Sequence, residues 1–196
     1  GRLSKQNGIK IQEFPEDTWK QEFKKAKDIG FQTIEWIFDS KDNPIMDDNK
    51  LQSIVKKSKE YDITINSIIA DFFMGNLLSS NDSKIDENLE TLKKLIKNAN
   101  KLNIKTIEIP FVDSSSLKSK QEIDILEKNI KEIIPILEKN QTVLGLETDL
   151  KPIEFKKLLE KINHPNIKAN YDSGNSASLG YNVYEEFELL GKWIKN

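Results

Sequence analysis

The 196-residue chain contains no cysteine, a single histidine (His164) and a single arginine (Arg2). Without cysteine it forms no disulfide, has no thiolate nucleophile and binds no zinc through sulfur. Because nearly all of the positive charge is lysine, bidentate recognition of phosphates or bases by a guanidinium group is scarce. The formal net charge is −2, which gives no electrostatic drive toward nucleic acid. We therefore expect no nucleic-acid partner.

Long apolar runs are also absent. A membrane-spanning helix needs roughly 20 apolar residues, and the best candidate, residues 68–78, is interrupted by Asp71 and Asn76. The first residues, which start with Gly1 rather than Met, do not have the pattern of a secretory signal. Hydrophobic residues make up 37% of the chain and charged residues 32%. This composition predicts one soluble, cytoplasmic domain over residues 1–196, without a membrane partner.

The chain does contain a regular alternation of two hydrophobic periods. Helical spacing predicts helices at residues 17–29, 47–60, 82–102, 121–139, 152–161 and 184–190. Strand-like segments lie between them, at residues 31–38, 63–70, 105–111, 142–147 and 167–172. Pro135 is expected to kink or break its helix. Residues 1–3 and 193–196 are interpreted as the end of an earlier strand and the beginning of a later one.

Strands that alternate with amphipathic helices predict βαβ crossovers and a parallel sheet, which defines the fold class as α/β. A doubly wound open sheet fits the same alternation. Such a sheet usually has a glycine-rich phosphate loop after its first strand, and the chain contains no G-x-G-x-x-G or P-loop sequence.

Two of the predicted strands run directly into a carboxylate, at Glu147 and at Asp172. The carboxyl ends of parallel strands meet at one edge of a sheet, so both acids should face the same opening. Carboxylate oxygens are ligands for hard divalent cations, and the pair therefore predicts half of a metal site. Two plainer interpretations stay open: Glu147 caps the next helix or pairs with a lysine, and Asp172 caps a turn, since Asp-Ser-Gly-Asn is turn sequence.

Three further positions are candidates for substrate contact. Glu35 and Glu108 lie inside apolar strands, where an isolated charge is costly, so each either pairs structurally or points toward the ligand. Structural pairing is the stronger interpretation for both. Phe73 lies in the apolar segment 71–75, which either covers the core or forms a hydrophobic wall over a substrate, in its own subunit or a neighbouring one of a homo-oligomer. His164 precedes a strand, so it is expected at the amino end of the sheet, opposite the carboxyl ends where the site is expected.

Several segments together resemble the xylose isomerase-like TIM-barrel superfamily. They are Gly1-Arg-Leu-Ser, Gly30-Phe-x-x-Ile-Glu35, Leu146-Glu147-Thr148 and Tyr171-Asp172-x-Gly-Asn175. The resemblance covers the whole chain and implies an incomplete (β/α)8 barrel, with about strands one to six and the start of strand seven. The superfamily includes sugar and sugar phosphate isomerases and epimerases, and endonuclease IV. The single histidine of this chain does not fit the histidine-rich metal cluster of the endonuclease branch.

The resemblance implies a divalent-metal-dependent isomerase or epimerase that acts on a sugar or sugar phosphate. In the family pattern a Glu ending strand five, an Asp ending strand six, a His and a further Glu bind Mn²⁺, Mg²⁺ or a similar ion. Glu147 and Asp172 match the first two ligands, and the other two are not in this chain. Glu147 would also belong to the acid–base pair that moves a proton through an enediolate.

Two positions depart from the ketose 3-epimerases. Asn175 stands where they often have a substrate-binding histidine, and Ile153 stands where they have a glutamate. Asn175 is therefore a substrate-binding candidate, but the identity of the sugar is open. Two alternatives to the enzyme also stay open: a barrel that binds a sugar or polyol without catalysis, and an inactive fragment that lacks half of its metal site and exposes two sheet edges.

Overall fold

The computed structural model describes residues 3–5 and 12–195. Its five parallel strands form one sheet in sequential order: β1 (Thr33–Ile37), β2 (Thr64–Ile69), β3 (Thr106–Phe111), β4 (Val143–Thr148) and β5 (Ile167–Ala169). The predicted five-stranded parallel sheet is confirmed. Beyond β5, Ile194 forms a parallel bridge with Ala169, where a further strand was expected to begin. Residues 1–2 and 196 of the two predicted strand fragments lie outside the described residues.

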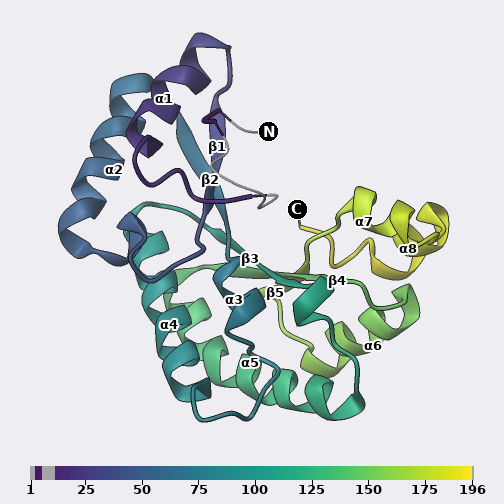
Figure 1. Cartoon of the computed structure of the whole chain (residues 1–196). Helices are drawn as coiled ribbons and strands as arrows, with labels where there is room; N and C mark the ends of the chain where they lie inside the picture. Colours follow the sequence, from purple (N-terminus) through teal and green to yellow (C-terminus); the bar gives the residue numbers. More distant parts are fainter. Residues whose placement is uncertain (1–2, 6–11, 196) are drawn as a thin grey trace.

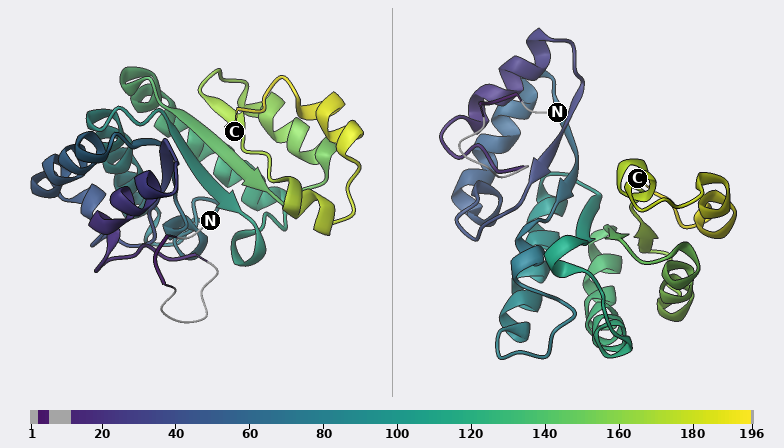
Figure 2. Two further views of the ribbon diagram at one scale, coloured as in Figure 1. Left: turned by 90° about the horizontal axis from the view of Figure 1, so that it is seen from above. Right: turned by 45° about the vertical axis from the view of Figure 1, so that its right-hand side comes forward.

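Helices precede, connect and follow the strands, and the longer ones cover the outer side of the sheet. They are α1 (Trp19–Asp28), α2 (Asp48–Tyr61), α3 (Phe72–Gly75), α4 (Ile85–Lys101), α5 (Lys120–Asn140), α6 (Pro152–Ile162), α7 (Ser173–Ser178) and α8 (Val183–Leu190), with 3₁₀ turns η1 (Pro44–Met46) and η2 (Asp113–Ser115). The two views in Figure 2 show the longer helices outside an arc of strands, and neighbouring helices contact one another along this arc. No helix in the described part of the chain has the length and apolarity to cross a membrane.

The predicted break at Pro135 is wrong, because α5 continues across it. A proline removes one backbone hydrogen bond from a helix. In this helix the loss is compensated by a buried apolar face on both sides of Pro135, formed by Leu126, Ile130, Ile133 and Leu137. The short helices α3 and α7 were not predicted, since four and six residues are too few to show a helical period.

The strands place hydrophobic side chains toward the helices and polar ones toward the concave side. Trp36 is buried against Phe14 and Trp19, with ring centroids 5.0 and 5.5 Å apart. Its neighbour Glu35 points the opposite way and accepts a 2.5 Å hydrogen bond from Ser67 of β2. Because side chains alternate along a strand, the same alternation carries through the register and brings polar groups to the inner face. Trp36 and Glu35 therefore lie on opposite faces of β1.

Buried amides hold the connections that follow the first strands. Asn43 donates to the carbonyl of Ile37 (2.9 Å) and accepts from Trp36 Nε1 (2.9 Å), so it fixes the turn after β1. Asn98 of α4 donates to the carbonyl of Ile45 at 2.8 Å. Two of these bonds satisfy backbone carbonyls, and the third satisfies the indole N–H of a buried tryptophan. The result is a rigid frame on the β1 side of the sheet.

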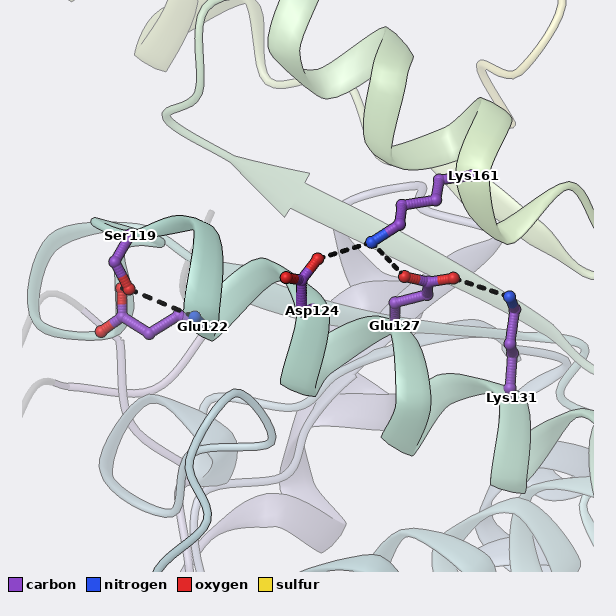
Figure 3. A network of polar contacts seen from close by, with 6 residues as sticks. All are labelled: Ser119, Glu122, Asp124, Glu127, Lys131 and Lys161. Atoms are coloured by element: carbon purple, nitrogen blue, oxygen red, sulfur yellow. Dashed lines mark hydrogen bonds and ion pairs between the residues drawn. The ribbon is translucent and has the colours of Figure 1, made fainter.

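The outer surface carries ion pairs between helices. Figure 3 shows Lys161 of α6 beside two carboxylates of α5, Asp124 at 2.6 Å and Glu127, while Lys131 contacts the other oxygen of Glu127 at 2.6 Å. Ser119 caps the start of α5 by accepting a hydrogen bond from the backbone N–H of Glu122 (3.2 Å). Exposed pairs of this kind contribute little to stability each, and they link α5 to α6 on the side away from the candidate site.

Candidate active site

Glu147 is the penultimate residue of β4 and lies next to Pro110 of β3 in the register. Its side chain is largely buried, with 9% of the residue exposed. Both carboxylate oxygens accept hydrogen bonds from amide side chains: Oε1 from Asn175 of α7 at 2.6 Å and Oε2 from Asn170, just after β5, at 3.2 Å. Glu147 is thus held by two residues from the neighbouring strand end, and no lysine pairs with it among the described residues.

Asp172 lies three residues beyond the end of β5, because the strand is shorter than the predicted 167–172. It is the N-cap residue of α7, and its Oδ1 accepts hydrogen bonds from the backbone N–H groups of Gly174 (2.7 Å) and Asn175 (2.9 Å). The capping interpretation is therefore confirmed. Both capping bonds go to the same oxygen, and the side chain is exposed. A carboxylate used in this way still has its second oxygen directed to solvent or to a ligand.

Negative charges converge on the inner side of the strand ends. Burial raises the pKa of Glu147, and the charge of Asp172 raises it further, while the hydrogen bonds from Asn170 and Asn175 act in the opposite direction. The charge of Asp71, which follows β2, adds to the increase. Burial also raises the pKa of Asp71 itself. A proton or a cation bound between these carboxylates would remove their mutual repulsion.

The donor set of Glu147 and Asp172 fits a hard divalent cation. Two carboxylates that repel each other at one sheet edge are the oxygen ligands that Mn²⁺ or Mg²⁺ takes. Across residues 3–5 and 12–195, however, no group of three or more His, Cys, Asp or Glu side chains is placed to hold a metal ion. The described residues therefore offer two candidate ligands and not a complete site.

The other predicted substrate contacts are distributed over the sheet. Asn175 lies directly beside Glu147, through the 2.6 Å hydrogen bond. Glu35 is paired with Ser67, and Glu108 is 4% exposed on the inner face of β3, near Gly145. Phe73 is 1% exposed and packs in the core. The structure thus brings Asn175, Glu147 and Asp172 together, and places Phe73 away from solvent; the substrate roles of these residues stay predictions.

Sequence reasoning missed Asn170 and Glu186. Asn170 could have been found, because strand alternation puts it on the same side as Asp172. Glu186 gave no such signal, since a glutamate in an amphipathic helix is normally interpreted as surface. It is 3% exposed and accepts hydrogen bonds from Tyr171 (2.9 Å) and Ser176 (2.7 Å).

Alternating helices and parallel strands with acids at the strand ends are typical of TIM-barrel proteins. The sequence profile of the xylose isomerase-like TIM barrel family matches residues 23–196, so the chain belongs to this family. No curated protein sequence is similar enough to the chain to count as a match.

Solved structures share the fold at low sequence identity. D-psicose 3-epimerase with D-tagatose from Clostridium cellulolyticum H10 superposes with a TM-score of 0.75 at 17% identity, over 90% of this chain and 65% of that one. A xylose isomerase-like TIM barrel protein from Mycobacterium smegmatis in complex with magnesium has a TM-score of 0.71 at 15% identity, over 91% and 65%. The probable 3-DHS dehydratase from Bacillus anthracis has a TM-score of 0.67 at 23% identity, over 95% and 68%. The chain spans about 65% of the length of the first two proteins.

Proposed function

We propose that this chain is part of a divalent-metal-dependent isomerase or epimerase that acts on a sugar or sugar phosphate. Glu147 carries the proposal. It is a carboxylate at the carboxyl end of a parallel strand, where TIM barrels place their chemistry. Burial and the neighbouring Asp172 raise its pKa, which is the direction that a proton-transferring carboxylate needs near neutral pH.

Glu147 and Asp172 would hold the metal together with ligands from outside this chain. A bound Mn²⁺ or Mg²⁺ supplies Lewis-acid polarisation of a carbonyl and of its adjacent hydroxyl. Glu147 would take the proton from the carbon next to the carbonyl, which leaves an enediolate, and the second member of the acid–base pair would supply the proton that completes an epimerisation. Asn170 and Asn175 orient Glu147 by donating to its two oxygens, and in this proposal Asn175 also contacts the substrate.

The neighbours support this reaction class without identifying the substrate. One of them is a ketose 3-epimerase with a sugar bound, and another contains magnesium. Removal of a proton next to a carbonyl is the first step of both isomerisation and epimerisation, so Glu147 could act as the base in either reaction. Epimerisation also requires the second member of the acid–base pair, which protonates the opposite face of the enediolate. The choice between a free sugar and a sugar phosphate is left to a substrate screen.

The metal can be tested by titration calorimetry with Mn²⁺ on the natural full-length protein. We expect Glu147→Gln and Asp172→Asn each to weaken binding by at least about 100-fold, more than the loss of an outer-shell partner costs. Glu185→Gln is the matched control, because Glu185 is exposed on α8, and it should bind as the wild type does. Mn²⁺ affinity that is unchanged in both site variants would refute the metal assignment.

The reaction can be tested by incubating ketoses and their phosphates with the protein in D₂O and following them by NMR. Incorporation of deuterium at the carbon next to the carbonyl, lost in Glu147→Gln, is the expected result. Metal-dependent sugar binding without deuterium incorporation would instead favour the non-catalytic sugar- or polyol-binding barrel.

A further inference from the structure

Glu186 is a buried carboxylate behind the candidate site. It lies in the first half of α8, which Figure 1 shows beside α7, beyond the ends of β4 and β5. With 3% of the residue exposed, it is more buried than Glu147 itself. A charged or polar group at this depth is costly unless hydrogen bonds compensate it, so its contacts decide what it does.

The two oxygens of Glu186 bind both ends of one short segment. Oε2 accepts from the hydroxyl of Tyr171 at 2.9 Å, and Oε1 accepts from the hydroxyl of Ser176 at 2.7 Å. Tyr171 immediately precedes Asp172, and Ser176 immediately follows Asn175. Glu186 therefore spans the segment that carries the predicted metal ligand and the amide that donates to Glu147.

Apart from the hydrogen bond that Asn175 donates to Glu147 at 2.6 Å, this segment has few contacts that fix its position. None of the residues of α7 is buried, so the helix is not held by a hydrophobic face. The contact between α7 and α8 is instead polar, and one ring contact adds to it, between Tyr171 and Phe187 at 5.1 Å. A six-residue helix without a buried face gains its stability from such contacts rather than from helix propensity.

We propose that Glu186 is a positioning residue, which holds residues 171–176 so that Asp172 and Asn175 face Glu147. Glu186 touches neither of the proposed metal ligands, and it acts through the hydroxyls of Tyr171 and Ser176. The proposal rests on the proposed function for its metal, although the restraint of α7 by Glu186 is measurable without any metal.

Three variants separate the hydrogen bonds from the bulk of the side chain. Glu186→Leu keeps a buried side chain of similar size and removes both acceptors. Glu186→Gln keeps the contacts, since its carbonyl accepts from one hydroxyl and its amide donates to the other, and hydroxyls serve in either role. Ser176→Ala removes a single bond and provides a milder test if the leucine variant does not fold. Glu188→Gln is the control, because Glu188 is exposed on the same helix.

Hydrogen exchange measured by mass spectrometry on the metal-free, full-length protein tests the restraint. We expect faster exchange at the backbone amides of residues 174–176 in Glu186→Leu and, to a smaller degree, in Ser176→Ala. Glu186→Gln and Glu188→Gln should exchange as the wild type does. Unchanged exchange in a folded Glu186→Leu or in Ser176→Ala would overturn the proposal.

Calorimetry with Mn²⁺ on the same variants tests the consequence for the site. We expect affinity to fall by about 10- to 100-fold in Glu186→Leu, the range for residues that orient a ligand from outside the coordination shell, and to recover in Glu186→Gln. Wild-type affinity in a folded leucine variant would overturn the proposal. If the wild type itself binds no Mn²⁺, the proposed function and the metal part of this proposal both fail, and the exchange measurement still decides whether Glu186 holds α7.

Discussion

After β1 and β2 the chain packs aromatic rings over the end of the sheet, whereas after β4 and β5 it presents carboxylates and amides. On the β1 side, the ring of Phe38 lies 5.2 Å from that of Phe72 and 6.3 Å from that of Phe73. On the β5 side, Asp172 is exposed, and the helix that follows it buries nothing. One sheet edge thus combines an apolar, closed half with a polar, open half.

The two halves of this edge contribute differently: one mainly to stability, the other to the candidate site. Packed aromatic rings stabilise the fold through their buried area and tolerate little change. Polar connections held by a few hydrogen bonds are cheaper to open locally, and such segments are the ones that bind ligands. Substitutions in the closed half should therefore change the free energy of unfolding, while substitutions in the open half should change metal binding.

The largest expected effect is that of Phe73→Ala. It removes a fully buried ring from contact with Phe38 and Phe72 and leaves a cavity, so the free energy of unfolding should fall by about 3–5 kcal/mol. Urea denaturation followed by tryptophan fluorescence measures the loss, with Phe73→Leu as a milder version. If Phe73 instead served as a wall of the substrate site, Phe73→Leu would weaken substrate binding more than it destabilised the fold.

A smaller loss is expected for Asn43→Ala, about 1–3 kcal/mol. Asn43 is buried, and its amide satisfies Trp36 Nε1 and the carbonyl of Ile37, both of which would be left without their partners. The same denaturation experiment gives the value, and Asn140→Ala is a control because Asn140 bonds only the last turn of its own helix in the described residues. A loss no larger than that of Asn140→Ala would contradict the rigid frame that we assign to this half.

The closed half was the more predictable of the two. Its strands and helices show strong hydrophobic periods, and these periods predicted where the elements lie. The exception is Phe73. An apolar segment after a strand looks the same in the sequence whether it covers the core or lines a ligand site, because only tertiary packing distinguishes the two.

In the open half, the two acids were predicted from the sequence, but the residue that holds their segment in place was not. Glu147 and Asp172 were found because they follow apolar strands. The capping role of Asp172 was indicated by the turn sequence Asp-Ser-Gly-Asn. Glu186 was not found, because its role depends on a contact between α7 and α8 that no local pattern encodes. Residues that position a site often come from a different helix or strand than the site residues themselves, so the local sequence gives little sign of them.

A change in the open half should alter the pH dependence of stability. The folded-state pKa of Glu147 is raised above its unfolded value of about 4.3. The stability that this group contributes is therefore complete below the unfolded pKa and is lost as pH rises through the folded pKa. Glu147→Gln does not titrate, so the difference in melting temperature between the metal-free variant and the wild type should shift in favour of the variant from pH 4.5 to pH 8. Thermal denaturation across that range measures it, and a constant difference would contradict the raised pKa.

The smallest effect is expected outside both halves, for Lys161→Ala on the outer surface. Lys161 pairs with Asp124 and Glu127, and its side chain is 44% exposed. Exposed ion pairs contribute little to stability, and Lys131 still pairs with Glu127 after the substitution. We therefore expect a loss of stability smaller than that of Asn43→Ala, and a smaller one still in high salt, where charges are screened. A loss comparable to that of Asn43→Ala would mean that the α5–α6 surface stabilises the fold as strongly as the aromatic half of the sheet edge does.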